Sequence, residues 1–168
     1  HEWGHGLDNR YGGISNSVAE GLSEGWGDII GMYQVDSPIL GSGFQSPGQG
    51  IRNGNNSRVW PYSSGVSPHG AGEVWMGWAW RFREALRSTL GTAAAIQISD
   101  DVVLSSIVAD ATNREDAVLE VFIAADAPVQ VFPSTALVSI QFAPVPATSA
   151  CSLDLACGSP RSGVVWGG

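Results

Sequence analysis

The clearest amphipathic pattern in the chain lies between residues 15 and 35. Its apolar positions recur at spacings of four and three: Val18, Leu22, Trp26, Ile29 and Tyr33. Residues with this spacing share one face of a helix, so the pattern predicts a helix with one buried stripe. Ser15 and Ser17 are candidates for its N-cap, and the pattern ends near Val35.

A second long helix is predicted from just after Pro68 to about Leu90. Every fourth residue of its stripe is apolar: Val74, Trp78, Phe82, Leu86 and Leu90. Gly91 is expected to end it. Its arginines, Arg81, Arg83 and Arg87, are expected to lie on a solvated face and to pair with Glu84.

Two shorter helices are expected next. One has Ser99 as its N-cap, carries Asp100 and Asp101 in its first turn, and buries Val103 and Ile107, with Val108 as a further candidate. The other has Asn113 as its N-cap and runs through Ala125, with Glu115 and Asp116 at the positive end of the helix dipole.

The remaining stretches do not have a helical pattern. Residues 36–68 are rich in Gly, Ser, Asn and Pro and are expected to form a long irregular loop. After Pro128 the period changes to two at Val138, Ile140 and Phe142, which predicts a strand or an extended tail. The expected organisation is a mainly α lobe over residues 1–126, followed by a tail or the start of a further module over residues 127–168.

Composition narrows the class of protein. The chain has 168 residues, of which 43% are hydrophobic, and this is enough for one domain with its own core. Its 16 acidic and 8 basic residues give a net charge of −8, which argues against nucleic-acid and anionic-membrane partners. The sequence contains no run of 18 apolar residues, so it predicts no membrane-spanning helix. Four tryptophans lie in the two long helices, where core packing is a stronger expectation than sugar stacking.

The chain begins with the stretch HEWGHGLDNRYGG, in which a helix over residues 1 to about 12 is expected to stop at two glycines. His1 and His5 share one face of this helix and can reach one metal ion. Glu2 lies beside the first histidine, in the H-E-x-x-H arrangement of zinc hydrolases. Since the chain starts on a candidate ligand, we expect it to be part of a longer protein.

A catalytic zinc ion needs a third protein ligand. The metzincin pattern does not supply one, because its glycine and final histidine positions are Asp8 and Tyr11. Glu24, in SEGWGD about twenty residues downstream of His5, is the preferred candidate, and Glu20 is the alternative. Asp28 lies one turn beyond Glu24 and is expected to accept the second ring N–H of a ligand histidine.

The sequence leaves alternative roles for the third histidine and for the two cysteines. His69 precedes a helix after a glycine-rich loop, where it could hydrogen-bond a developing oxyanion or could be a surface histidine with no role. Cys151 and Cys157 match no zinc-binding spacing, and they could form a local disulfide or remain two thiols.

The segments HEWGHGLDNR, SEGWGD and HGAGEVW resemble the active-site segments of fungalysin-type metallopeptidases, which belong with thermolysin to the gluzincins. The resemblance extends over residues 1 to about 126 and includes REDAVLEVFIAAD near its end. It implies that His1, His5 and Glu24 bind Zn²⁺, that Glu2 is the general base, and that His69 is the histidine found downstream of the zinc ligands.

The same resemblance implies a fold and a reaction. The fold is the helical C-terminal lobe of a two-lobed gluzincin, with an upstream lobe and a propeptide in the longer, secreted protein. The reaction is zinc-dependent hydrolysis of internal peptide bonds in a peptide or protein substrate. Two alternatives stay open: a zinc hydrolase of another substrate class, and a non-catalytic metal-binding remnant, which would be expected to have lost Glu2.

Overall fold

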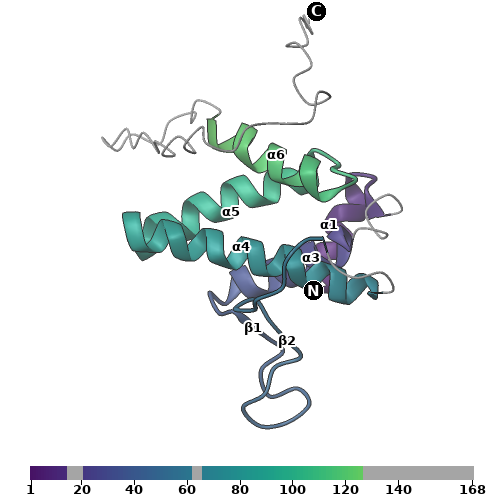
Figure 1. Cartoon of the computed structure of the whole chain (residues 1–168), viewed down its shortest axis with the longest axis vertical. Coiled ribbons are helices and arrows are strands. Elements are labelled where there is room, and N and C mark those ends of the chain that lie inside the picture. The colour runs from purple at the N-terminus through teal and green to yellow at the C-terminus, as the bar shows by residue number, and fades with distance from the viewer. Residues whose placement is uncertain (15–20, 62–65, 127–168) are drawn as a thin grey trace, which may run out of the picture. The chain divides into compact units, whose positions relative to one another are not determined.

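The computed structural model describes residues 1–14, 21–61 and 66–126, and this part of the chain is mainly helical, as predicted (Figure 1). It contains the helices α1 (Glu2–Arg10), α3 (Leu22–Gln34), α4 (Pro68–Leu90), α5 (Thr92–Val108) and α6 (Arg114–Asp126). The short strands β1 (Ile39–Leu40) and β2 (Arg52–Asn53) pair antiparallel, with Ile39 opposite Asn53. The predicted strand at 138–142 and both cysteines lie outside the described residues.

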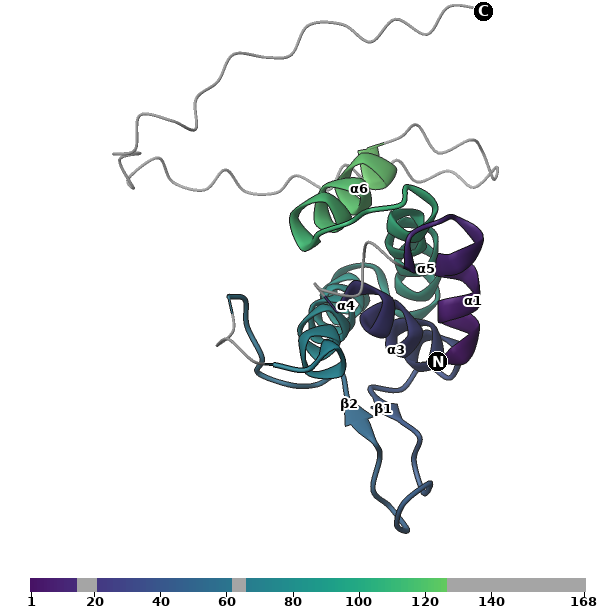
Figure 2. The ribbon, with the colours of Figure 1, turned by 90° about the vertical axis from the view of Figure 1, so that its right-hand side faces the viewer.

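The core forms where α3, α4 and α5 pack together. The predicted stripe of α3 is confirmed from Leu22 onward, since Leu22, Trp26, Ile29 and Tyr33 are all buried. Figure 2 shows α1 beside α3 on one side of these helices and α6 across α5. The core also contains Trp75, Met76, Ala79, Val103 and Ile107, among others.

The start of α3 differs from the prediction. The helix begins at Leu22, not near Ser15 or Ser17, because Gly21 has a φ of 69° in the left-handed region. A helix cannot pass through a residue in this conformation, which glycine adopts at little cost. Val18 and the serines lie outside the described residues.

The start of α5 was also predicted wrongly. The helix begins at Thr92, immediately after Gly91, which ends α4 as predicted. Ser99 is fully buried inside the helix and donates its hydroxyl to the carbonyl oxygen of Ala95 at 2.6 Å. Serine can bond back to its own helix in this way, so its presence did not mark a cap. Val103 and Ile107 are buried, but Val108 is 55% exposed.

Arg83 is the largest departure from the predicted pattern on α4. It is fully buried, and its guanidinium lies 3.4 Å from the centroid of the Tyr33 ring. It donates to Ser99 at 2.8 Å and pairs with Asp36 and Asp100. The Tyr33 ring that it contacts is itself buried, and this burial raises the pKa of the Tyr33 hydroxyl. An arginine with this many partners can replace a hydrophobic residue in the core.

The other features of α4 follow the prediction more closely. Arg87 pairs with Glu84 at 3.4 Å, and Arg81 is exposed. Of the four helical tryptophans, Trp26, Trp75 and Trp80 are buried, and Trp78 is half-buried. These side chains are part of the core or pack against it, as the spacing predicted.

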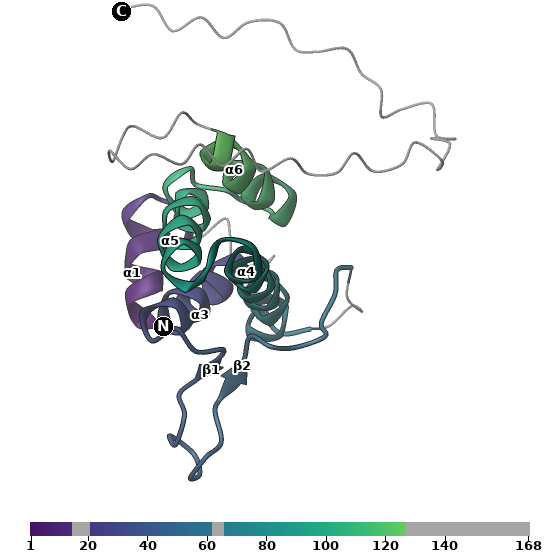
Figure 3. The same cartoon turned by 90° about the vertical axis from the view of Figure 1, so that its left-hand side faces the viewer.

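The predicted cap of the last helix is confirmed, since the Asp116 amide donates to Asn113 Oδ1 at 2.9 Å. The described residues of the predicted loop, 36–61 and 66–67, are irregular except for the β1–β2 hairpin, which projects away from the helices (Figure 3). In the described ranges, no helix has the length and hydropathy needed to cross a membrane.

Candidate metal centre

Two glycines allow α1 to lie directly against α3. A Cβ atom on Gly4 would lie 2.5 Å from the Cα atom of Gly27, and one on Gly27 would lie 2.9 Å from Nδ1 of His1. These distances are shorter than any ordinary contact, so side chains at both positions would push the helices apart. The close approach places His1 and His5 of the N-terminal segment over the start of α3, where Glu24 lies.

Three donor atoms meet at this crossing. His1 Nε2 lies 3.1 Å from His5 Nε2 and 3.2 Å from Glu24 Oε2. His5 Nε2 lies 3.5 Å from the same carboxylate oxygen. Ligands at about 2.0–2.1 Å from a tetrahedral zinc ion are separated from one another by about 3.3–3.4 Å. The triangle therefore has the size that three zinc ligands require.

The second ring nitrogens of both histidines are already bonded. Nδ1 of His1 lies 2.7 Å from Asp28 Oδ1, and Nδ1 of His5 lies 2.9 Å from Ser23 Oγ. A carboxylate can only accept, so Nδ1 of His1 carries a proton, and when the ring is neutral its Nε2 presents a lone pair to the triangle. The hydrogen bond to Asp28 raises the pKa of His1 above its usual value, although desolvation opposes this shift.

Asp28 is held from its other side by Arg52 on β2. The side chain of Asp28 is fully buried, and Arg52 reaches it with Nε at 2.6 Å from Oδ2 and a terminal nitrogen at 2.8 Å from Oδ1. This ion pair compensates the buried negative charge, and the hydrogen bond to Oδ1 helps to orient the carboxylate. The Asp28 carboxylate in turn fixes the orientation of the His1 ring.

His69 joins the same group from the first turn of α4. Its Nε2 lies 3.1 Å from Glu24 Oε2, and its ring is nearly parallel to that of His1, with centroids 6.2 Å apart. His1, Glu24 and His69 offer ligand atoms within 4.8 Å of one another, a looser set than the triangle that includes His5. With 55% of its side chain exposed, His69 is the member most open to an incoming molecule.

Of the residues predicted from the sequence, His1, His5, Glu24, Asp28 and His69 are brought together here. Glu2 is exposed on the first turn of α1, next to His1. Glu20, the alternative ligand, lies outside the described residues. The preference for Glu24 over Glu20 therefore stays a prediction.

The sequence prediction missed Ser23 and Arg52. Ser23 could have been noticed, because it directly precedes Glu24 and lies near the same end of the helix. Arg52 follows a long irregular stretch with no periodic pattern, so its contact with Asp28 depends on tertiary structure alone.

The donors fit a zinc ion. Two imidazole nitrogens and one carboxylate oxygen are a known catalytic set, and the three atoms lie at contact distance from one another. Such an arrangement needs a cation or protons between the atoms to offset their repulsion. Glu24 Oε2 is shielded from water, and the groups that face it at ion-pair distance within the described residues are the three imidazoles.

Comparisons of the chain with protein-family models, curated proteins and solved structures found no match.

Proposed function

We propose that this chain carries the catalytic centre of a zinc-dependent endopeptidase, with His1, His5 and Glu24 as zinc ligands. The proposal is supported most directly by the convergence of two Nε2 atoms and one carboxylate oxygen within 3.5 Å of one another. The resemblance of the three active-site segments to fungalysin-type enzymes supports the peptide substrate, the secreted location, and the upstream lobe and propeptide of the longer protein.

Each residue of the centre has a separate task in this proposal. A bound zinc ion supplies Lewis-acid polarisation of a carbonyl and lowers the pKa of water towards about 7. Glu2 accepts the proton of the attacking water and passes it to the leaving amine. His69 donates a hydrogen bond to the oxyanion that develops on the substrate carbonyl. Asp28 and Ser23 hold the ligand rings of His1 and His5 in place.

Two alternatives use the same geometry. A zinc hydrolase of another substrate class would keep every ligand and differ in the groups that contact the substrate. A non-catalytic metal-binding remnant would keep the ligands and lose the need for Glu2. The presence of Glu2 next to His1 favours an enzyme.

The assignment of the third ligand is tested by metal analysis of the full-length protein. We expect about one zinc ion per chain in the wild type and in Glu20→Ala, and loss of zinc in Glu24→Ala. Unchanged zinc in Glu24→Ala together with loss of zinc in Glu20→Ala would show that the third ligand was assigned wrongly.

The catalytic role of Glu2 is tested by Glu2→Gln, which keeps the size of the side chain but removes the proton acceptor. We expect zinc content to stay near one ion per chain and casein hydrolysis to fall about 10²-fold to 10⁴-fold. His69→Phe should also keep zinc and lower kcat. Near-normal peptidase activity in zinc-loaded Glu2→Gln would refute the mechanism.

A further inference from the structure

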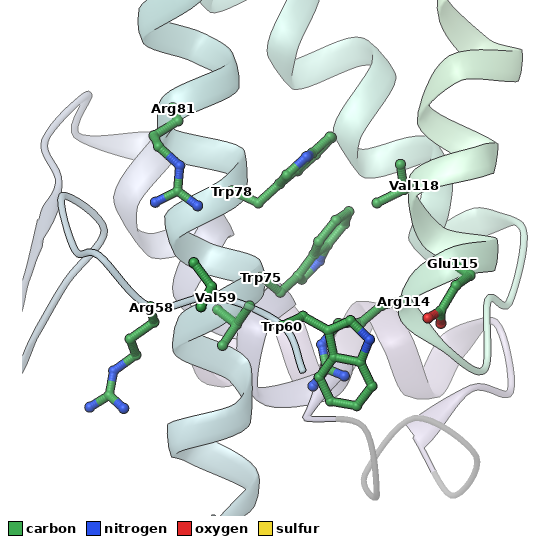
Figure 4. Close-up of a pocket in the computed structure, with 10 residues that line it drawn as sticks. Arg58, Val59, Trp60, Trp75, Trp78, Arg81, Arg114, Glu115 and Val118 are labelled. Atoms are coloured by element: carbon green, nitrogen blue, oxygen red, sulfur yellow. The ribbon is translucent and has the colours of Figure 1, made fainter. Parts of the chain in front are cut away.

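A cavity of about 570 Å³ lies between α4, α6 and the segment formed by residues 58–60 (Figure 4). None of the residues of the metal centre lines it. Cavities of this size commonly bind small molecules or single side chains of a partner. The cavity is therefore a candidate second site, separate from the metal centre.

The apolar part of the cavity wall consists of three tryptophans and three valines. Figure 4 shows the rings of Trp75 and Trp78 projecting from α4 towards Val118 of α6, with Trp60 near one end. The rings of Trp75 and Trp78 are stacked, with centroids 4.7 Å apart and planes 10° apart. Trp78 also stacks on Phe82, with centroids 5.5 Å apart, so the faces of these rings are covered by one another and their edges remain for a ligand. The edge of an aromatic ring is its positive part and favours the face of a second aromatic ring.

The charge at the cavity is opposite to that of the whole chain. The chain has a net charge of −8, yet three of its 8 basic residues, Arg58, Arg81 and Arg114, line this cavity. Among the described residues, the one acidic side chain that lines it is Glu115. A local excess of positive charge next to apolar walls favours an anionic ligand, because the low-dielectric surroundings strengthen the attraction.

Two of these guanidinium groups have specific contacts of their own. Arg58 Nε lies 2.8 Å from Glu73 Oε2, and the Arg114 guanidinium lies 4.0 Å from the centroid of the Trp60 ring. Arg81 differs, because its hydrogen bond goes to a neutral group, the carbonyl oxygen of Asn56 at 2.8 Å. Within the described ranges, no carboxylate lies at ion-pair distance from Arg81. Its charge is therefore available to a ligand.

We propose that this cavity binds a carboxylate attached to an aromatic ring. The face of the ring lies against the edges of Trp75 and Trp78, and the carboxylate binds the guanidinium of Arg81, which can hold two oxygens at once. An inorganic anion would not use the aromatic walls, and an uncharged ring would not use the guanidinium. Two sources share this chemistry: a free aromatic acid, and the C-terminal residue of a peptide that ends in an aromatic side chain. The proposal does not rest on the proposed peptidase function.

The test uses 3-phenylpropionate as the anionic probe and 3-phenylpropionamide as its uncharged counterpart. Binding is measured by calorimetry on the full chain carrying Glu24→Ala, so that the probe cannot bind a zinc ion. We expect the acid to bind at least about tenfold more tightly than the amide. Arg81→Gln should remove this preference, and Arg10→Gln on α1 should leave it unchanged, since Arg10 is exposed and does not line the cavity.

A second measurement locates the probe. In ¹H–¹⁵N spectra the indole N–H signals of Trp60, Trp75 and Trp78 should shift on addition of the acid, and that of Trp3, which is 78% exposed on α1, should not. Equal binding of acid and amide, an unaltered preference in Arg81→Gln, or no shift of the three indole signals would overturn the proposal. Tighter binding of acetyl-Ala-Ala-Phe than of the free acid would identify a peptide C terminus as the source, and the reverse order would identify a small acid.

Discussion

The carboxylate of Asp28 connects the metal centre to the hairpin. Its Oδ1 accepts from His1 Nδ1 and from Arg52, and its Oδ2 lies at ion-pair distance from Arg52 Nε. Asp28→Asn keeps the shape but removes the charge, and an amide offers only one accepting oxygen. We expect the affinity for zinc to fall about 10-fold to 100-fold, as is typical when the hydrogen-bond partner of a ligand histidine is changed.

The affinity is measured by competition with a chromogenic chelator. Asp101→Asn is the matched control, because Asp101 is exposed on α5, away from the residues of the centre. Equal zinc affinity in Asp28→Asn and Asp101→Asn would mean that Asp28 does not support the ligand.

Arg83 is the other residue whose environment makes a strong prediction. Replacing it by Met would leave the Asp36 and Asp100 carboxylates without this partner and the Ser99 hydroxyl without its donor. The two carboxylates left behind are 30% and 39% exposed, and Asp36 keeps its ion pair with Arg87. We therefore expect the free energy of unfolding to fall by about 1–3 kcal/mol, less than when a fully buried charge loses its partner. Urea denaturation measures the loss, and a loss below about 1 kcal/mol would show that the network contributes little.

At the scale of helices, the contact between α1 and α3 depends on Gly4. An alanine there would place its Cβ atom 2.5 Å from the Cα atom of Gly27, a backbone atom that cannot move independently. We expect Gly4→Ala to lower the free energy of unfolding by about 1–3 kcal/mol and to weaken zinc binding. Gly6 lies on the same helix, and a Cβ atom added there would have nothing within 4 Å, so Gly6→Ala should stabilise the protein slightly.

The comparison is made by thermal unfolding monitored by circular dichroism. Similar Tm values for the two alanine variants would mean that the α1–α3 contact tolerates a larger separation than the structure indicates.

The helices were predictable where local spacing determined them, and not where tertiary contacts did. His1 with His5, and Glu24 with Asp28, are pairs four residues apart, so their shared faces followed from the sequence alone. The true starts of α3 and α5 did not, because Gly21 takes a left-handed conformation and Ser99 is buried against Arg83. Residue type suggested an exposed arginine and a capping serine, and packing made each of them part of the interior.

For the whole molecule, the centre joins elements that are far apart in the sequence. Its side chains come from the N-terminal segment with α1, from α3 and from the first turn of α4, and Arg52 on β2 contacts Asp28.

A ligand that binds only the folded state stabilises it by about 2.7 kcal/mol when its free concentration is 100 times its Kd. We expect removal of zinc by a chelator to lower Tm of the wild-type protein, measured by calorimetry. Glu24→Ala should show no such change, and an equal decrease in that variant would place the stabilising metal elsewhere.

Because α1 buries few side chains, it is expected to unfold locally before the rest of the protein. The only fully buried residues of this helix are Gly4 and Asp8, whereas α3 and α4 bury large side chains along most of their length. Segments with few buried apolar contacts open locally at lower free energy than the core, and their amide hydrogens exchange earlier with solvent. A bound ion would then hold α1 against α3 through His5 on the helix and His1 at its N-cap. Loss of the ion would release that helix before the rest of the fold, so that amide exchange in α1 reports metal occupancy while exchange in the middle of α4 does not.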